Sequence, residues 1–459
     1  MACTGSPKSI RLRFTSLLIA VLFLWSIESY KSLGRAISRH NISNTSAEAN
    51  PTFYRDVLPI LVRNCQPCHH RGGVAPMPFE TYEDTGRYSK LISTVTGDKT
   101  MPPSFAVPEI GQVTNDPSLS REQIETLKNW ADANGPAGNP ADAPVHPRES
   151  GHWSIGYPTK IVSLSNFGQL PVSHGPQYIY EIVRTRFTRG RWIQAAEISP
   201  SRPANLLHAV VFIRPRDSKW LRKAPVGKPF VTDTVTAARG VSENWKTSDI
   251  LVVYSSGSPA GQWPTGMAKF IPAGADLIFQ MQYVTDGNVE ADRIEIGMLF
   301  SKKAPAMRIL TLQIANQNFV IPPNASEYRV DARGILPKDA RLLSCFPLMH
   351  LRGKRFEYDI IHRDQIADLR SQPKIETLLR VNYDSRWQVN YTFVERRMLE
   401  AGTELQAVAW YDNSQLNPRN PNPNVSVRWG EKPSDEIMAC FFDVAIPATA
   451  NREDYAPLD

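Results

Sequence analysis

The sequence predicts a multidomain chain, in which a small all-α domain precedes two all-β sandwiches. At 459 residues the chain is too long for one ordinary hydrophobic core. Apolar residues recur at helical spacing between about residues 52 and 138. Further along, short runs of alternating apolar and polar residues separated by turn signals predict β-strands. About 300 residues of this kind exceed one sandwich, so we expect two packed β domains.

The first 45 residues read as an export segment. Three basic residues precede an apolar run over residues 14–27, which matches the n-region and h-region of a secretory signal. The run is short for a transmembrane helix, and the residues after it form a poor cleavage site. A cleaved signal and an uncleaved anchor both stay open. In either case we expect residues 1–45 to be a signal or anchor with a tether, and the remainder to be exported.

Two predicted helices frame the next domain, residues 46–140. The first leads into Cys65 and is interrupted by Pro59. Its apolar face consists of Phe53, Val57, Ile60 and Leu61. The second begins with a capping box at residues 120–123 and ends at Gly135-Pro136. Its apolar stripe consists of Ile124, Leu127 and Ala131.

The pentapeptide Cys65-Gln66-Pro67-Cys68-His69 is typical of a covalent haem attachment site. The two thiols can form thioethers to the haem vinyl groups, and the imidazole of His69 lies where it can bind the iron. A zinc half-site would require a second Cys/His pair close by, and none follows. A thioredoxin-like dithiol would require a βαβ setting, whereas the flanks look helical and proline-rich.

A haem of this kind usually takes a methionine as its sixth ligand. Met101 lies in Lys99-Thr100-Met101-Pro102-Pro103, where two prolines predict a stiff loop. Met77, in Ala75-Pro76-Met77-Pro78, is the rival candidate. We prefer Met101, because Met77 is so close to His69 that the chain would have to loop tightly around the haem edge.

The stretch from about Thr52 to Gly138 resembles the cytochrome c domains fused to larger periplasmic bacterial proteins. The resemblance is carried by CQPCHH, APMPFETYED, TMPPS and TNDPSLSREQIETLKNWAD. It implies covalently bound haem c, with iron ligands His69 and Met101. It also implies a location at the periplasmic face of a bacterial membrane, and a periplasmic or membrane redox partner.

Composition excludes other function classes. The net charge is +7, but Lys and Arg form no run longer than two, so the sequence gives little support to nucleic-acid binding. The five cysteines do not form a disulfide framework, since two belong to the haem motif and Cys3 precedes the apolar run of the export segment. Cys345 and Cys440 are left, either as a pair in an oxidising compartment or as two unrelated buried thiols.

We predict a Pro-, Ala- and Gly-rich linker over residues 141–160, and two β domains over 161–304 and 305–459. Period-two alternation is clearest at residues 293–300 and 404–407. The predicted turns are Asp286-Gly287, Arg333-Gly334 and Ala401-Gly402.

Three stretches of the β region resemble the copper type II, ascorbate-dependent monooxygenases, the family of peptidylglycine alpha-hydroxylating monooxygenase. The first stretch is RWIQAAEISPSRPANLLHAVVFIRP, and the second is AKFIPAGADLIFQMQYVTDG. The third starts with SCFPLMHLRGKRFEY, continues with WYDNSQLNPRNPNP and ends with VRWGEKPSDEIMACFFDV. The resemblance implies two jelly-roll-like sandwiches, with one copper on each, facing across a solvent-filled cleft. Such a cleft would take a small-molecule or peptide ligand.

The copper ligands of that family are largely replaced in this chain. Where relatives have His-His, the chain has Leu207-His208, and a third histidine is replaced by Gln282. The His-Met-His of the second copper is here Leu348-Met349-His350. The final methionine is replaced by Ile437, with Met438 one residue later and on the opposite strand face unless a bulge intervenes. The remnant copper positions are therefore His208, Gln282, His350 and Met438.

These patterns favour an exported, membrane-anchored c-type cytochrome with an electron-transfer role, fused to a monooxygenase-like module that has lost its copper. The alternative is an active copper- and haem-dependent monooxygenase that hydroxylates a C–H bond. A structural envelope protein would leave the haem motif unexplained. The sequence identifies no catalytic residue.

Overall fold

The computed structural model describes residues 50–71, 73–144, 153–165, 177–201, 206–231, 249–255, 257–283, 293–362, 373–430, 432, 434–455 and 458. Residues Pro51–Asp459 form one compact unit. The predicted export segment, the turn at Asp286-Gly287 and much of the predicted linker lie outside the described residues. Among those described, no helix combines the length and the apolar character needed to cross a bilayer.

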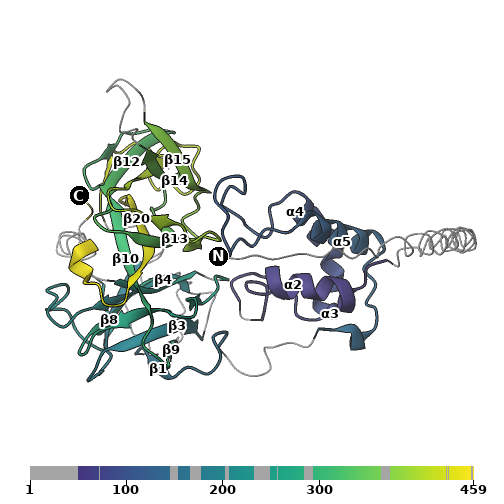
Figure 1. Ribbon diagram of the computed structural model, residues 1–459. Helices are drawn as coiled ribbons and strands as arrows, with labels where there is room; N and C mark the ends of the chain where they lie inside the picture. The colour runs from purple at the N-terminus through teal and green to yellow at the C-terminus, as the bar shows by residue number, and fades with distance from the viewer. Residues whose placement is uncertain are drawn as a thin grey trace, which may run out of the picture. The chain divides into compact units, whose positions relative to one another are not determined.

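Residues 51–144, here called the helical segment, carry the helices (Figure 1, purple to blue). They are η1 (Phe53–Val57), α2 (Leu58–Asn64), α3 (Tyr82–Thr85), η2 (Gly86–Tyr88), α4 (Ser89–Gly97), α5 (Arg121–Asp132) and η3 (Pro140–Asp142). Both predicted helices are present. Pro59 is accommodated rather than disruptive, because it stands in the first turn of α2, where a backbone N–H has no intrahelical partner. At the start of α5, Ser120 and Gln123 form the predicted capping box.

One small apolar core holds the helical segment together. Trp130 of α5 is fully buried, and its indole Nε1 donates to the carbonyl of Pro136 at 3.0 Å. Phe53 N donates to that same carbonyl at 2.9 Å, which ties the start of the segment to its end. The core residues are Phe53, Val57, Leu58, Ile60, Leu61, Phe79, Ile92, Leu127 and Trp130.

In the rest of the described chain the regular secondary structure is almost entirely β-strand, as predicted. The first β half contains β1 (Lys160–Ser163), β2 (Gln177–Arg184), β3 (Arg191–Pro200), β4 (Leu206–Arg214), β5 (Asp249–Ser255), β6 (Gly261–Gln262), β7 (Met267–Ile271), β8 (Asp276–Tyr283) and β9 (Ile294–Phe300). The second β half contains β10 (Met307–Ala315), β11 (Val320–Ile321), β12 (Tyr328–Ile335), β13 (Ala340–Leu348), β14 (Gly353–His362), β15 (Lys374–Asn382), β16 (Tyr391–Thr392), β17 (Met398–Leu399), β18 (Glu404–Tyr411), β19 (Val427–Arg428) and β20 (Ala439–Pro447), followed by η5 (Arg452–Tyr455).

A ten-stranded sheet runs through both halves. Its main path is β1-β9-β3-β7-β10-β20-β13-β16, with β6 and β17 attached to β3 and β13. The sheet passes from one half to the other where β10 pairs in parallel with β7, Met307 lying opposite Met267. Two four-stranded sheets, β2-β8-β4-β5 and β12-β18-β14-β15, complete the two halves. The predicted sandwiches therefore share one sheet.

Three apolar cores follow from this arrangement. Each half has its own core between its part of the long sheet and its four-stranded sheet. A third core joins the halves, with Tyr180, Val210 and Phe212 on one side and Phe346 and Phe441 on the other. We call this contact the junction. Because apolar residues of both halves pack together at the junction, the two halves belong to one compact unit.

The strand predictions are largely confirmed. The alternation at residues 293–300 becomes β9, and that at 404–407 begins β18. Gly402 forms the predicted turn, with φ +87°. The turn predicted at Arg333-Gly334 is wrong, because both residues continue β12, opposite Gln406 and Leu405. Burial alternates through them, so cross-strand pairing overrides the local turn signal.

A buried ion pair links strands from the two halves. Lys269 of β7 is 2% exposed, and its Nζ lies 2.8 Å from the carboxylate of Asp443 on β20. The same ammonium donates to Thr311 Oγ1 at 3.1 Å and to the carbonyl of Ile250. Every proton of the buried ammonium therefore has an acceptor.

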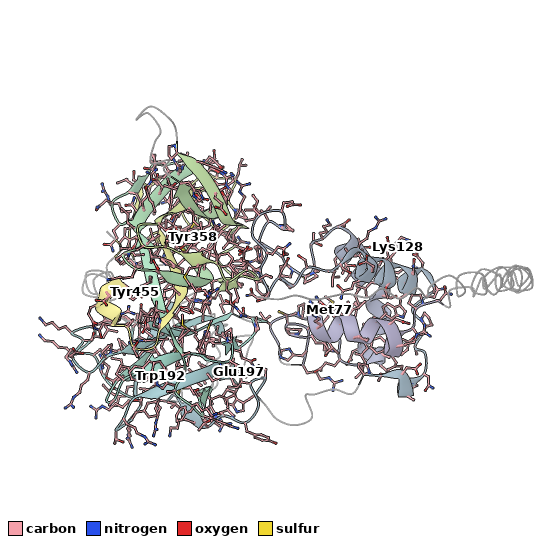
Figure 2. The ribbon with its side chains drawn as sticks, in the orientation of Figure 1. Met77, Lys128, Trp192, Glu197, Tyr358 and Tyr455 are labelled. Carbon is pink, nitrogen blue, oxygen red and sulfur yellow. The ribbon has the colours of Figure 1, made fainter. Side chains whose placement is uncertain are left out.

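Replacement of Lys269 by alanine is expected to lower the free energy of unfolding by about 3–5 kcal/mol, because Asp443 would stay buried without a counter-ion. Lys269→Met combined with Asp443→Leu should recover most of that loss. Lys128→Ala is the control, since Lys128 (labelled in Figure 2) pairs with Asp132 on the exposed face of α5 and should change stability by less than about 1 kcal/mol. Urea denaturation measures all three, and equal midpoints for Lys269→Ala and Lys128→Ala would contradict the expectation.

Candidate functional site

The imidazole of His69 is held in one orientation beside the end of α2. Its Nδ1 donates to the carbonyl of Met77 at 2.8 Å, and its ring stacks on Phe79 with centroids 4.5 Å apart. Its Nε2 has no hydrogen-bond partner within the described part of the chain. Burial lowers the pKa of His69, although the Met77 carbonyl opposes this. The ring is therefore a neutral imidazole with Nε2 available to a metal, an orientation typical of metal-bound histidines.

The two cysteines lie in one turn of chain that continues α2. The backbone N–H groups of Cys68 and His69 both donate to the carbonyl of Cys65, at 3.1 and 2.8 Å. Both cysteines are half-buried thiols. Burial raises the pKa of Cys65 to about 12 and that of Cys68 to about 11. A redox dithiol needs a lowered pKa on its attacking thiol, so this environment does not suit that chemistry.

A zinc site finds no support either. The described residues contain no group of three or more His, Cys, Asp or Glu side chains able to hold one metal ion. The donors at the motif are two neutral thiols and one imidazole, a set that suits thioether formation and a single axial bond. These residues therefore fit a covalently bound haem.

Met77 and Met101 lie in different settings. Met77 (labelled in Figure 2) packs against the apolar core of the helical segment, and its carbonyl is the acceptor for His69 Nδ1. The Met77 carbonyl thus lies at the Nδ1 edge of the imidazole. The side chain of Met101 is 42% exposed, and its backbone N–H donates to the carbonyl of Val95 at the end of α4.

The first β half touches the cysteine motif at a glycine. Gly257 follows β5 and has φ +81°, and a Cβ there would lie only 2.3 Å from Cys68 Sγ. A side chain at this position would collide with the sulfur. The contact brings the turn after β5 against the motif.

Two of the remnant copper positions are cross-strand neighbours. His208 of β4 lies opposite Gln282 of β8 and, on its other side, opposite Ser255 of β5. Within the described residues, neither ring nitrogen of His208 has a hydrogen-bond partner, and Oε1 of Gln282 also lacks one. Burial lowers the pKa of His208 to about 3. His208 is therefore a neutral ring packed against Phe346, with centroids 5.9 Å apart.

The other two remnant positions, His350 and Met438, lie just after β13 and just before β20. His350 lies beside Tyr178 of the first half, with ring centroids 5.8 Å apart. Its Nδ1 lies 3.1 Å from the carbonyl of Asp435, and burial lowers its pKa to about 4. Met438 packs into the core of the second half, whereas Ile437 packs into the junction. The side chains of the neighbouring residues Ile437 and Met438 thus enter different cores.

The residues do not fit two copper centres. Each of the two copper positions keeps a single imidazole, that of His208 or that of His350. Met438, which follows the replaced ligand position Ile437, packs into a different core from Ile437. The cleft implied by the family resemblance is occupied here by packed side chains, among them Tyr178 against His350 and His208 against Phe346. Ser255 Oγ also donates across the junction to the carbonyl of Gln388 at 2.5 Å.

One residue or more from each of the motifs LRGK, DNS and RWGEKPSDE takes part in a hydrogen-bond network in the second half. These residues are Arg352, Asn413, Ser434 and Glu436. Glu436 is fully buried and accepts the backbone N–H groups of His350 at 2.9 Å and Arg352 at 2.7 Å. The Arg352 guanidinium donates to Asn413 Oδ1 at 2.8 Å and to the carbonyl of Ser434 at 2.9 Å. Burial raises the pKa of Glu436 to about 7. These residues thus hold neighbouring loops in place.

Cys345 and Cys440 lie side by side in the core of the second half, with sulfur atoms 3.0 Å apart. They lie diagonally across β13 and β20, because Cys345 is opposite Phe442 and Cys440 is opposite Pro347. The two thiols are therefore neighbours, not unrelated buried residues.

Several residues of these sites were missed from the sequence. Tyr178, Gln388 and Glu436 meet His350 or Met349 from distant parts of the chain. Gly257 carries no local signal beyond a turn preference. Only pairing across strands brings them to the sites, so no motif spacing could have identified them.

Comparisons with known proteins add little. No protein-family model matches the chain. No curated protein matches it either. Among solved structures, one of PNGF-II is similar at 12% identity over 62% of this chain, with a TM-score of 0.23. This chain spans 60% of the PNGF-II chain.

Replacement of His208 by leucine is expected to weaken the acid sensitivity of folding. The pKa of His208 is about 3 in the folded protein and near 6.5 when unfolded, so the unfolded state takes up a proton first as pH falls below about 6.5. Stability is therefore full above that pH and declines below it, by up to about 1.4 kcal/mol per pH unit for this one group.

The measurement is the difference in unfolding free energy between wild type and variant from pH 7 to pH 4. Gln282→Leu is the control, since it changes the neighbouring buried amide but no titrating group. Parallel stability–pH curves for wild type and His208→Leu would refute the expectation.

Proposed function

We propose that this protein is an exported, membrane-anchored c-type cytochrome that transfers electrons, and that its β module serves without copper. The observation that carries the proposal is the His69 imidazole, fixed through Nδ1 and open at Nε2, one turn after two neutral thiols. The helical segment would then be a cytochrome c domain, and the two β halves a jelly-roll-like module related to the copper type II monooxygenases.

Each residue of the site has a defined task in this proposal. Cys65 and Cys68 would attach the haem, and His69 Nε2 would bind its iron. Met101 would supply the sixth ligand, while the Met77 carbonyl would keep His69 Nδ1 occupied. The haem would supply a one-electron Fe(III)/Fe(II) couple whose potential a methionine ligand raises. Phe79 and the Met77 carbonyl would hold the imidazole during the exchange.

The β module offers a cavity of about 440 Å³ that suits a small ligand. Its walls come from both β halves and from the helical segment, and they include Asn115, Trp263, Lys269 and Phe346. None of the four remnant copper positions lines it. The second candidate function, copper- and haem-dependent hydroxylation, would need a metal site that these positions do not form. A docking or ligand-binding role for the module is therefore favoured.

Spectra of the full chain, produced in a host competent in cytochrome maturation, test the haem assignment. We expect covalent haem in wild type and its loss in Cys65→Ser/Cys68→Ser, because no thiol would remain to form a thioether. His69→Ala should lose the low-spin spectrum. A colourless wild-type protein would end the proposal.

Met101→Ala should remove the sulfur-to-iron charge-transfer band while covalent haem is retained, because the iron would lose its thioether ligand. Met77→Leu is the matched control and should keep the band. A band that survives in Met101→Ala and disappears in Met77→Leu would assign the sixth ligand to Met77 instead.

Metal analysis of the haem-loaded protein separates the two candidate functions. We expect about one iron and no stoichiometric copper per chain after incubation with copper and gel filtration. The reason is that most side chains that would bind copper directly are replaced. Copper retained at one or two equivalents, with a cupric paramagnetic signal that His208→Ala or His350→Ala abolishes, would favour the monooxygenase.

A further inference from the structure

The chain that follows Met101 is bound to an edge strand of the second β half. Asn382 N donates to the carbonyl of Phe105 at 2.8 Å, and Val107 N donates to the carbonyl of Arg380 at 2.9 Å. Ala106 lies antiparallel to Val381 and is buried in the core of the second half. Residues 105–107 thus add a short strand to the free edge of β15.

A second contact fixes the far end of the same segment. Thr114 N donates to the carbonyl of Thr392 in β16 at 2.8 Å. The side chain of Asn115 bonds twice to the backbone there: Nδ2 donates to the carbonyl of Asn390 at 2.8 Å, and Oδ1 accepts from Thr392 N at 3.0 Å. Asn115 therefore works as a backbone mimic that pairs with the edge of the long sheet.

The segment between these contacts leaves little room for movement. Gly111 has φ +73°, and a Cβ there would lie 1.9 Å from the carbonyl oxygen of Leu378. Ser104 Oγ donates to Asp116 Oδ1 at 2.8 Å and closes the segment at its base. Residues 104–116 are consequently held as a closed loop against β15 and β16.

The hold extends back to Met101. The backbone N–H groups of Thr100 and Met101 both donate to the carbonyl of Val95 at 3.0 Å, which fixes the loop at α4. Pro102 and Pro103 then restrict the backbone up to Ser104. Met101 therefore lies in a short, stiff stretch fastened to α4 on one side and to the second β half on the other.

We propose that Asn115 is a positioning residue for the sixth haem ligand, and that the edges of β15 and β16 hold the loop that keeps the Met101 sulfur on the iron. The proposal rests on the proposed function. In this proposal the β module has a role that requires no metal, because β15 and β16 of the second β half hold the loop that follows Met101. A loosened loop would let other ligands compete with the sulfur.

The experiment uses the full, haem-loaded chain, with imidazole as the competing iron ligand. Asn115→Ala removes two hydrogen bonds from the loop, so imidazole should displace the sulfur at about tenfold lower concentration than in wild type. The charge-transfer band should also disappear at a lower pH on alkaline titration. Asn139→Ala is the matched control, because it removes a side-chain bond to Ala141 N in the same helical segment, away from the loop.

Two further variants keep the test independent of folding defects. Gly111→Ala should weaken the Met–iron bond in the same way through its collision with Leu378. Asn115→Asp keeps the acceptor for Thr392 N and should fall between wild type and Asn115→Ala. Covalent haem at one per chain shows that each variant is assembled.

The outcomes separate the two levels of the argument. A charge-transfer band that survives in Met101→Ala would reject the ligand assignment, and this inference with it. If Met101→Ala behaves as expected, while Asn115→Ala and Gly111→Ala match the Asn139→Ala control in imidazole affinity and alkaline titration, then the positioning role alone is wrong.

Discussion

The parallel pairing of β7 with β10 is the constraint on which the rest of the β region depends. It continues one sheet through both halves, and the Lys269–Asp443 ion pair ties β7 to β20 across β10. With the sheet continuous, the outer face of β2-β8-β4-β5 packs against β13 and β20 and forms the junction. The rings of His208 and His350 lie against residues of this junction, whereas Met438 packs into the core of the second half.

Closure of the junction sets the environment of two buried histidines, His208 and His350. An open cleft would leave His208 and His350 hydrated and able to accept a metal. Here both rings are buried and neutral, and each packs against an aromatic residue of the opposite half. The polar groups around His350 provide hydrogen-bond partners for Glu436 and Arg352. Without these partners, burial of the two charged side chains would lower the stability of the fold.

The helical segment and the second β half depend on each other. Residues 105–107 and 112–115 extend two sheet edges that would otherwise expose unpaired backbone groups. In return, the edges order a loop that has few internal hydrogen bonds. The second β half thus supplies hydrogen-bond partners that hold a loop of the short helical segment in place.

The sequence alone determined what depends on local spacing. The capping box at Ser120, the alternation that becomes β9 and the order of Cys65, Cys68 and His69 were all predicted, because neighbours along the chain create them. The turn predicted at Arg333-Gly334 failed, since pairing with β18 outweighs a local preference. Tertiary structure alone decided that the Met77 carbonyl accepts from His69 Nδ1, that Met438 and Ile437 enter different cores, and that Asn115 reaches β16. Each of these features arises from contacts or packing with residues outside the sequence motif. The spacing of residues along the chain does not specify such contacts.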